Sequence, residues 1–292
     1  GVHTTWDNTG GDTAAFGVGG TAGTVTVDAD GVTIGGLLFN ADVTGAYTLS
    51  GGPLTLSGTP VFTVNTNATI AAPLAGTVDF SKTGTGTLTL SSLNSSFDGD
   101  ITIAQGTLAA KAGQSSRAPT NSALGHLLVP RTITVEDGAA LSFLSHDVFG
   151  IAGVKPPVTI NGKSGGAIRN NGTFNVLGPV NLEGGALTTT GGAYDGYQAF
   201  QFTDTVTAGG SATINTMGGT YNGVHVDNNL FDVTGGTLTV SAPLINRYNN
   251  GSAGFVKAGV GTMVLAADNR FNGAVTVSNG LLQVGDGGAA GT

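Results

Sequence analysis

The chain contains no cysteine among its 292 residues. Neither a disulfide framework nor a thiolate metal site is therefore available. Charged residues are also scarce, at 10% of the chain, and ten lysines and arginines stand against eighteen aspartates and glutamates. The net charge of −8 and the scatter of the basic residues argue against nucleic acid as a partner, because nucleic acid is bound by clustered lysine and arginine.

Long hydrophobic runs are missing as well. No apolar run approaches the roughly 20 residues that a membrane-spanning helix needs, so we predict no membrane insertion by this segment. The first residues, Gly1-Val2-His3, do not begin a basic, hydrophobic signal peptide. We therefore expect either a processed mature form or an excised fragment.

Helix-forming residues are few. Glutamate occurs only at Glu136 and Glu183, whereas glycine occurs 51 times, and glycine costs about 1 kcal/mol relative to alanine inside a helix. An all-α fold and a helix-rich α/β enzyme are excluded on this basis. Disorder is also unfavoured, because 39% of the residues are apolar and mean hydropathy is +0.19.

Short stretches of alternating apolar and polar residues fill the chain. Examples are Thr24–Val27, Thr87–Leu90, Thr132–Val135 and Leu238–Val240, and turn signals such as Asn161-Gly162 separate such stretches. This period of two is typical of β-strands. Strands of 3 to 5 residues at this spacing fit a sandwich, a barrel or a β-solenoid, so periodicity alone does not choose among them.

An internal repeat favours the solenoid. The sequence KTGTGTLTL from Lys82 to Leu90 matches KAGVGTMVL from Lys257 to Leu265, and the match resumes at Phe97-Asp98-Gly99 and Phe271-Asn272-Gly273. Repeats of this kind indicate stacked rungs, each of which buries its apolar face only against its neighbours. We predict one continuous all-β parallel β-helix over residues 1–292, with repeat copies at 81–110 and 256–284. At about 22 residues per coil this makes about 13 coils, with loop excursions at 112–130 and 192–202.

The repeat resembles the autotransporter-associated β-strand repeat of bacterial surface proteins. The resemblance implies a single-stranded, right-handed parallel β-helix that is exported to the cell surface. It also assigns structural roles to corner glycines, inward-facing apolar residues and a lysine in each copy. These residues are Lys82, Gly84, Gly86, Leu88, Leu90, Gly99, Ile101, Ile103, Gly106 and Leu108 in the first copy, and Lys257, Gly259, Gly261, Leu265, Gly273, Val275, Val277 and Gly280 in the second.

Residues that could carry chemistry are few and separated. The acidic candidates are Asp28 with Asp30, Asp98 with Asp100, Glu136 with Asp137, and the pair His146-Asp147. Polysaccharide lyases and hydrolases on β-helices need a carboxylate cluster of this kind, but solvated turn aspartates are the simpler interpretation. We predict no catalytic residue, no metal site and no cofactor. Tyr194 and Tyr197, in an aromatic-rich stretch, are the candidate ligand-contacting residues.

The sequence therefore predicts a non-enzymatic, secreted or cell-surface structural protein of bacterial type: a stalk, fibre or adhesive spacer. Open strand edges at both ends have two explanations: the chain is cut from a longer solenoid, or the ends dock head to tail. We hypothesise the second, end-to-end self-association into a filament. A surface glycan or a protein receptor is the expected external partner. The alternative is a carbohydrate-binding or polysaccharide-cleaving β-helix protein that uses the aromatic segment and one aspartate pair.

Overall fold

The computed structural model describes residues 6–9, 11–17, 19–41, 44–113, 120–151, 153–190, 199–217, 223–246, 252–285 and 287. All regular secondary structure in these ranges is β-strand. None of them contains a helix long and apolar enough to cross a membrane.

Two long sheets run the length of this part of the chain, and twelve strands follow one another in each. The first sheet contains β1 (Thr13–Phe16), β3 (Val32–Phe39), β5 (Leu54–Val64), β8 (Phe80–Thr83), β10 (Ile101–Ile103), β14 (Arg131–Val135), β16 (Val158–Lys163), β19 (Val180–Glu183), β22 (Val206–Gly209), β25 (Asn229–Val233), β28 (Phe255–Ala258) and β30 (Val275–Val277), with β7 (Leu74–Ala75) beside β5. The second contains β2 (Thr24–Val27), β4 (Tyr47–Gly51), β6 (Ala68–Ile70), β9 (Thr87–Leu90), β11 (Thr107–Ala110), β15 (Ala140–Phe143), β17 (Ala167–Asn170), β20 (Ala186–Thr190), β23 (Ser211–Met217), β26 (Thr237–Val240), β29 (Thr262–Leu265) and β31 (Leu281–Val284).

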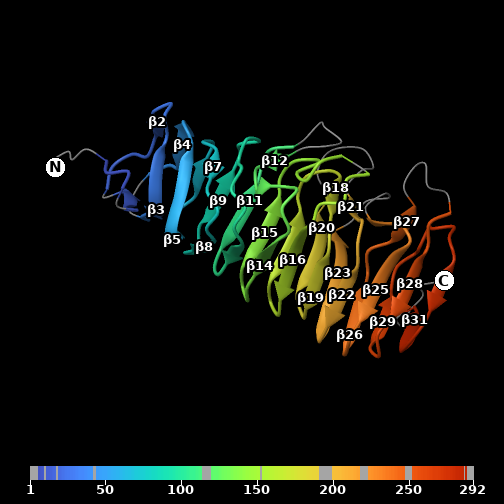
Figure 1. Cartoon of the computed structure of the whole chain (residues 1–292). Helices are drawn as coiled ribbons and strands as arrows, with labels where there is room; N and C mark the ends of the chain where they lie inside the picture. The colour runs from blue at the N-terminus through green and yellow to red at the C-terminus, as the bar shows by residue number, and fades with distance from the viewer. Residues whose placement is uncertain are drawn as a thin grey trace.

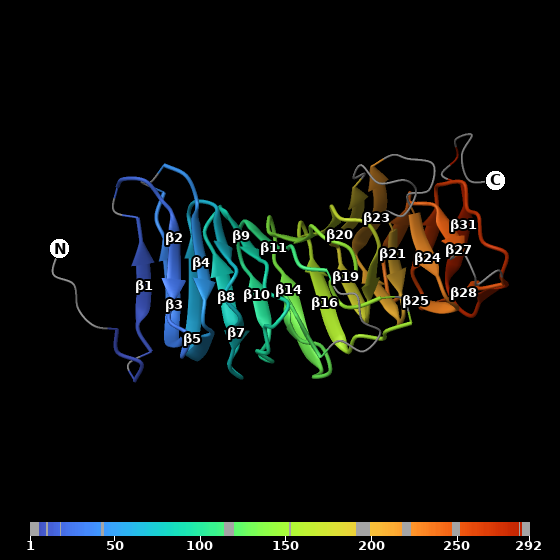
Figure 2. The same ribbon diagram turned by 90° about the horizontal axis from the view of Figure 1, so that it is seen from above.

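The chain alternates between the two sheets, so each coil adds one strand to each. Every pairing within them is parallel, for example Ile101 with Ile133 and Leu108 with Leu141. Figures 1 and 2 show the result, a stack of rungs that runs from the N-terminal end in blue to the C-terminal end in red. The predicted β-solenoid is confirmed.

A third face appears only in the later coils. It is a four-stranded parallel sheet of β18 (Asn175–Leu177), β21 (Ala199–Phe202), β24 (Gly223–Val226) and β27 (Leu244–Asn246). One antiparallel hairpin, β12 (Asn121–Ser122) with β13 (Gly125–His126), leaves the stack between β11 and β14.

The coils vary in length more than the sequence predicted. Phe62 pairs with Lys82, 20 positions later, whereas Ile103 pairs with Val135, 32 positions later. The long coil contains the hairpin β12–β13, which uses residues without adding a rung. The described part therefore has twelve rungs rather than about 13.

The interior follows from the alternation along each strand. In β9, Leu88 and Leu90 are buried, whereas Thr87 and Thr89 are partly exposed. Phenylalanines from successive rungs stack inside, with ring centroids 4.9 Å apart for Phe62 and Phe80 and 5.4 Å apart for Phe231 and Phe255. Aromatic contacts at this spacing add to the free energy gained from burial.

Both ends of the described stack leave interior positions uncovered. A cavity of about 300 Å³ at the first rungs is lined mainly by apolar residues, among them Trp6, Phe16 and Val27. At the last rung, Val275, Val277, Leu281 and Val284 are 39%, 47%, 55% and 62% exposed. Val275 and Val277 match the buried Ile101 and Ile103 of the first repeat, but no described rung stacks over them.

Candidate functional site

The lysine of each repeat lies inside the solenoid. Lys82 in β8 follows the inward-facing Phe80 by two positions, and Lys257 in β28 follows Phe255 in the same way. The alternation of the strand therefore turns both lysines inward, and both are 0% exposed. A buried ammonium group is costly unless every proton has an acceptor.

Lys82 meets this requirement with three carbonyl oxygens. Its Nζ donates hydrogen bonds to Gly84 O at 2.6 Å, Gly86 O at 2.6 Å and Gln105 O at 2.8 Å. Gln105 belongs to the next rung, so the ammonium group ties the turn after β8 to the turn after β10. Burial lowers the pKa of Lys82 to about 8.

Lys257 repeats the arrangement in the second copy. Its Nζ donates to Ala258 O at 2.8 Å, Gly259 O at 2.8 Å and Asn279 O at 3.0 Å. Burial lowers the pKa of Lys257, while the charge of Asp232 acts in the opposite direction. We call these two arrangements the lysine cages; both are structural, because no substrate can reach an ammonium group that is enclosed by the backbone.

The cages explain two of the repeat glycines. A Cβ atom on Gly106 would lie 2.6 Å from Nζ of Lys82, and a Cβ on Gly280 would lie 2.8 Å from Nζ of Lys257. Both glycines also have positive φ, 68° and 70°. Glycine is the residue that meets both conditions without strain.

The remaining repeat residues occupy interior or corner positions. Gly84 and Gly259 have positive φ, and a Cβ on Gly86, Gly99, Gly261 or Gly273 would lie 2.7 Å or less from an atom of a neighbouring rung. The buried apolar residues are Leu88, Leu90, Ile101, Ile103, Leu108 and Leu265, each at most 4% exposed. Tyr194 and Tyr197 lie outside the described residues.

The acidic candidates do not form one cluster. Asp28 with Asp30 lies between β2 and β3, and Glu136 with Asp137 lies between β14 and β15, several rungs away. His146 Nδ1 and Asp147 Oδ2 are 3.1 Å apart on an exposed turn. Among the described residues, no group of three or more His, Asp or Glu side chains could hold a metal ion.

Sequence reasoning did not identify a buried arginine, Arg131. It is 5% exposed, donates from Nε to His126 O at 3.2 Å and from Nη2 to Leu124 O, and lies 5.1 Å from the ring centre of Phe97. Burial lowers the pKa of Arg131 to about 10, and the charges of Asp100 and Asp98 oppose that shift. Arg131 thus fastens the hairpin β12–β13 to the solenoid.

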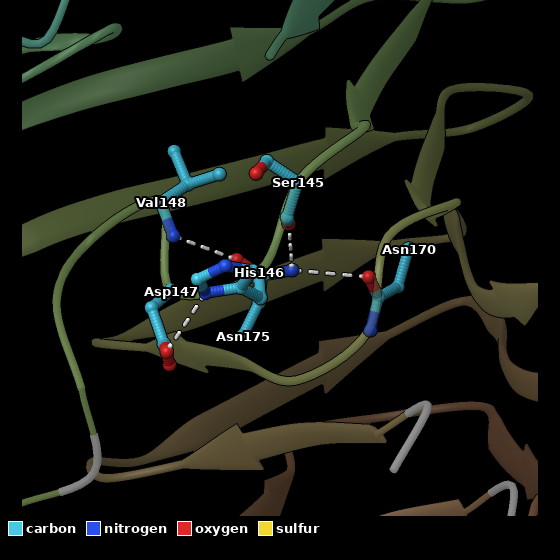
Figure 3. A network of polar contacts seen from close by, with 6 residues as sticks. All are labelled: Ser145, His146, Asp147, Val148, Asn170 and Asn175. Carbon is cyan, nitrogen blue, oxygen red and sulfur yellow. Dashed lines mark hydrogen bonds and ion pairs between the residues drawn. The ribbon is translucent and has the colours of Figure 1, made fainter. Parts of the chain in front are cut away.

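Asn175 is a second buried polar residue that sequence reasoning did not identify. Figure 3 shows its side chain between the turn after β15 and the end of β17. Its Nδ2 donates to Ser145 O at 2.9 Å and to Asn170 Oδ1 at 3.0 Å, and its Oδ1 accepts a hydrogen bond of 2.9 Å from the Val148 backbone N–H. Asn175 therefore fixes the path of the chain as it leaves the second sheet.

A surface groove of about 640 Å³ lies on the first sheet. It begins where the register between β3 and β5 shifts, because Ile34 pairs with Leu56 but Gly36 pairs with Val61. One residue of β3 therefore faces four residues of β5, which are Ser57, Gly58, Thr59 and Pro60. We call this stretch the 57–60 bulge; three of its residues line the groove together with residues of β8, β10 and β14.

Comparisons with known proteins agree with the repeat geometry. Residues 80–110 and 255–284 match the family model described as passenger-associated-transport-repeat. The chain is 29% identical, over 98% of its length, to the adhesin BmaC autotransporter of Brucella suis biovar 1 (strain 1330). The aligned region covers 10% of that adhesin, and no solved structure matches the chain. This chain is a β-solenoid in which two segments match the passenger-associated-transport-repeat model, and it is similar to an autotransporter adhesin.

Proposed function

We propose that this chain is a section of an exported bacterial surface protein, where it acts as a non-catalytic adhesive spacer. The observation that carries the proposal is the likeness to an adhesin autotransporter over 98% of the chain. The eleven steps between twelve stacked rungs, at about 4.8 Å each, give a rod about 53 Å long, which is suited to holding a surface away from the cell.

Surface location is tested on intact cells of the source bacterium. Antibodies raised against the purified chain should label intact cells, and external protease should remove the label while a cytoplasmic marker protein stays intact. Labelling that requires permeabilised cells would contradict the proposal. Adhesion is tested separately with beads that carry the chain at matched density, scored for attachment to cultured animal cells against beads that carry an unrelated β-solenoid.

We further propose that the two ends associate end to end, so that copies or further rungs extend one ladder. The exposed Val277 and Leu281 at the last rung and the apolar cavity beside Trp6 at the first rungs support this. The outermost strands of both ends also carry backbone groups that pair on one side only within the described part.

End-to-end association is tested by sedimentation over a range of concentrations and by electron microscopy. Val277→Lys should leave rods dispersed that associate in the wild type, because it places a charge in the contact. Leu128→Lys is the matched control, since Leu128 is 61% exposed but lies beside the hairpin, away from both ends. Dispersed wild-type rods at high concentration would refute the association.

A further inference from the structure

The groove beside the 57–60 bulge has the features of a built binding site. The extra residues of β5 interrupt its ladder with β3, whereas the next rung has a stretch of matching length, 76–80, opposite them. Bulges are over-represented where a protein re-aims side chains next to a site. Gly58 within the bulge has a φ of +67°, which an L side chain rarely adopts, although no atom lies near its Cβ position. The special backbone conformation therefore does not serve close packing at that position.

Two rows of polar side chains cross the groove in the direction of the solenoid axis. Ser81 pairs with Thr102 and Thr102 pairs with Thr134, so three hydroxyl groups occupy equivalent positions in three successive rungs. Asp79 and Asp100 precede the paired residues Phe80 and Ile101 and form a second row of equivalent positions. All five residues line the groove.

The two carboxylates are held in place by the backbone. Oδ1 of Asp79 accepts the backbone N–H of Asp100 at 2.8 Å, and Oδ1 of Asp100 accepts the backbone N–H of Thr132 at 2.7 Å. In each residue this fixes the orientation of the carboxylate and leaves Oδ2 available for a ligand. Both aspartates are exposed, and no lysine, arginine or histidine lines the groove.

We propose that this groove binds an extended, neutral oligosaccharide that lies along the solenoid axis. The lining offers hydroxyl groups, which donate and accept, beside carboxylates, which accept, and sugar hydroxyls match both kinds. A protonated amine only donates, so it would pair with the carboxylates but would accept nothing from the hydroxyl groups of the groove, which would stay bonded to water. An acidic polysaccharide would meet two carboxylates and no cation. The exposed Val61, beside the bulge, supplies apolar surface for a sugar ring.

The spacing of the rungs adds to this match. Equivalent side chains recur about every 4.8 Å along the axis, a step similar in length to one sugar unit of an extended chain. One polysaccharide could therefore place successive units over successive rungs. This inference rests on the adhesive role proposed above and names the ligand class for it.

Titration calorimetry of the purified chain tests the proposal. The probes are cellotetraose and chitotetraose as neutral ligands, tetragalacturonate as the anionic ligand and tetralysine as the cationic ligand. We expect a neutral probe to bind, and the double variant Asp79→Asn/Asp100→Asn to bind it about tenfold more weakly. The asparagines keep an oxygen for the backbone N–H groups but replace Oδ2 by a donor, so the fold is retained. Asp30→Asn, outside the groove, is the matched control and should bind as the wild type does.

A second variant removes the wall of the groove rather than its polar rows. Replacing residues 57–60 by a single glycine restores one-to-one pairing with β3 but leaves two residues of β5 opposite the five residues 76–80 of the next rung. It should abolish binding, and circular dichroism reports whether the sheet is intact. The proposal is overturned if no neutral probe binds, if binding is unchanged in the double variant, or if tetralysine binds in place of the sugars.

The bead assay separates this proposal from the adhesive role. If beads with the double variant attach to cells as well as wild-type beads do, adhesion stands and the groove is not its site. If a neutral probe binds in the groove but wild-type beads do not attach, the groove stands and the adhesive role fails.

Discussion

Replacing the buried lysine of the first repeat by methionine tests how the lysine cages hold the rungs together. Lys82→Met keeps the length and most of the volume of the side chain but removes the three donated hydrogen bonds. Gly86 O still accepts the backbone N–H of Thr107 at 3.3 Å. Gly84 O and Gln105 O lose their donor and accept no other hydrogen bond from the described residues.

The expected cost follows from two opposing contributions. A carbonyl left without its partner costs about 1 to 3 kcal/mol, so two of them cost several kcal/mol at most. Burying an ammonium group also carries a desolvation penalty, which the methionine removes. We expect the free energy of unfolding to fall by about 2 kcal/mol. Because each rung contacts only its neighbours, the loss should be concentrated near the affected turns.

Hydrogen–deuterium exchange with mass spectrometry measures this locally, and urea unfolding followed by circular dichroism measures it globally. Peptides from 80–110 should exchange faster in Lys82→Met, whereas peptides from 158–183 should not change. The control is Lys163→Met, which removes an exposed ion pair of 2.6 Å with Glu183 and should cost less than about 1 kcal/mol. A Lys82→Met variant as stable as the wild type would show that desolvation cancels the cage, and the reasoning would fail.

Three further predictions concern the same interior. Burial lowers the pKa of Lys82 from 10.5 to about 8, so between these pH values the unfolded chain binds more protons than the folded chain. The free energy of unfolding should therefore rise as the pH increases from about 8 to about 10.5. Urea unfolding of the wild type and of Lys82→Met measures this rise, which the variant should lack. Gly106→Ala should be more destabilising than Gly138→Ala by at least about 1 kcal/mol. The two glycines have nearly equal φ values, 68° and 69°, but only at Gly106 would an added Cβ atom have neighbours within 4 Å. Equal midpoints of thermal unfolding would contradict this. Asn175→Ala should lower the free energy of unfolding by about 2 to 4 kcal/mol and speed hydrogen–deuterium exchange around Val148, because it removes three hydrogen bonds. Asn181→Ala removes one partly buried hydrogen bond of 2.8 Å and should lower the free energy of unfolding by about 1 kcal/mol or less.

The fold could be predicted from the sequence because the repeat and the alternation point to the same structure. Two copies of one motif require stacking, and inward-facing residues such as Leu88 and Ile103 follow from the period of two. The same alternation predicts the buried cations. Lys82 lies two positions from Phe80, and Arg131 lies two positions from Ile133, so each shares the inward-facing side of its strand. The position of a residue in the alternation therefore predicts whether its side chain turns inward, even when the side chain is charged.

The partners of these side chains could not be predicted in the same way. Gln105 lies 23 positions from Lys82, and Ser145 lies 30 positions from Asn175. Pairing distances between successive rungs range from 19 to 33 residues, as for Ala167 with Ala186 and Thr107 with Ala140, because hairpins and bulges use residues without adding a rung. A constant coil of about 22 residues therefore gives the wrong neighbour wherever the chain makes an excursion, and the groove beside the 57–60 bulge arises from such a departure.

Regular rungs and irregular departures differ in how much substitution they can tolerate. Regular rungs are closely packed, so that Gly86 and Gly99 have no room for a Cβ atom. Their buried polar groups must also be paired, as are the three protons on Nζ of Lys82. A substitution there disturbs the stack before it can create a binding surface. The 57–60 bulge is less constrained, because no atom lies within 4 Å of the Cβ position of Gly58, and the hairpin β12–β13 pairs through only two residue pairs. We therefore expect substitutions at these departures to leave the stack intact while the lysine cages keep the rungs in register.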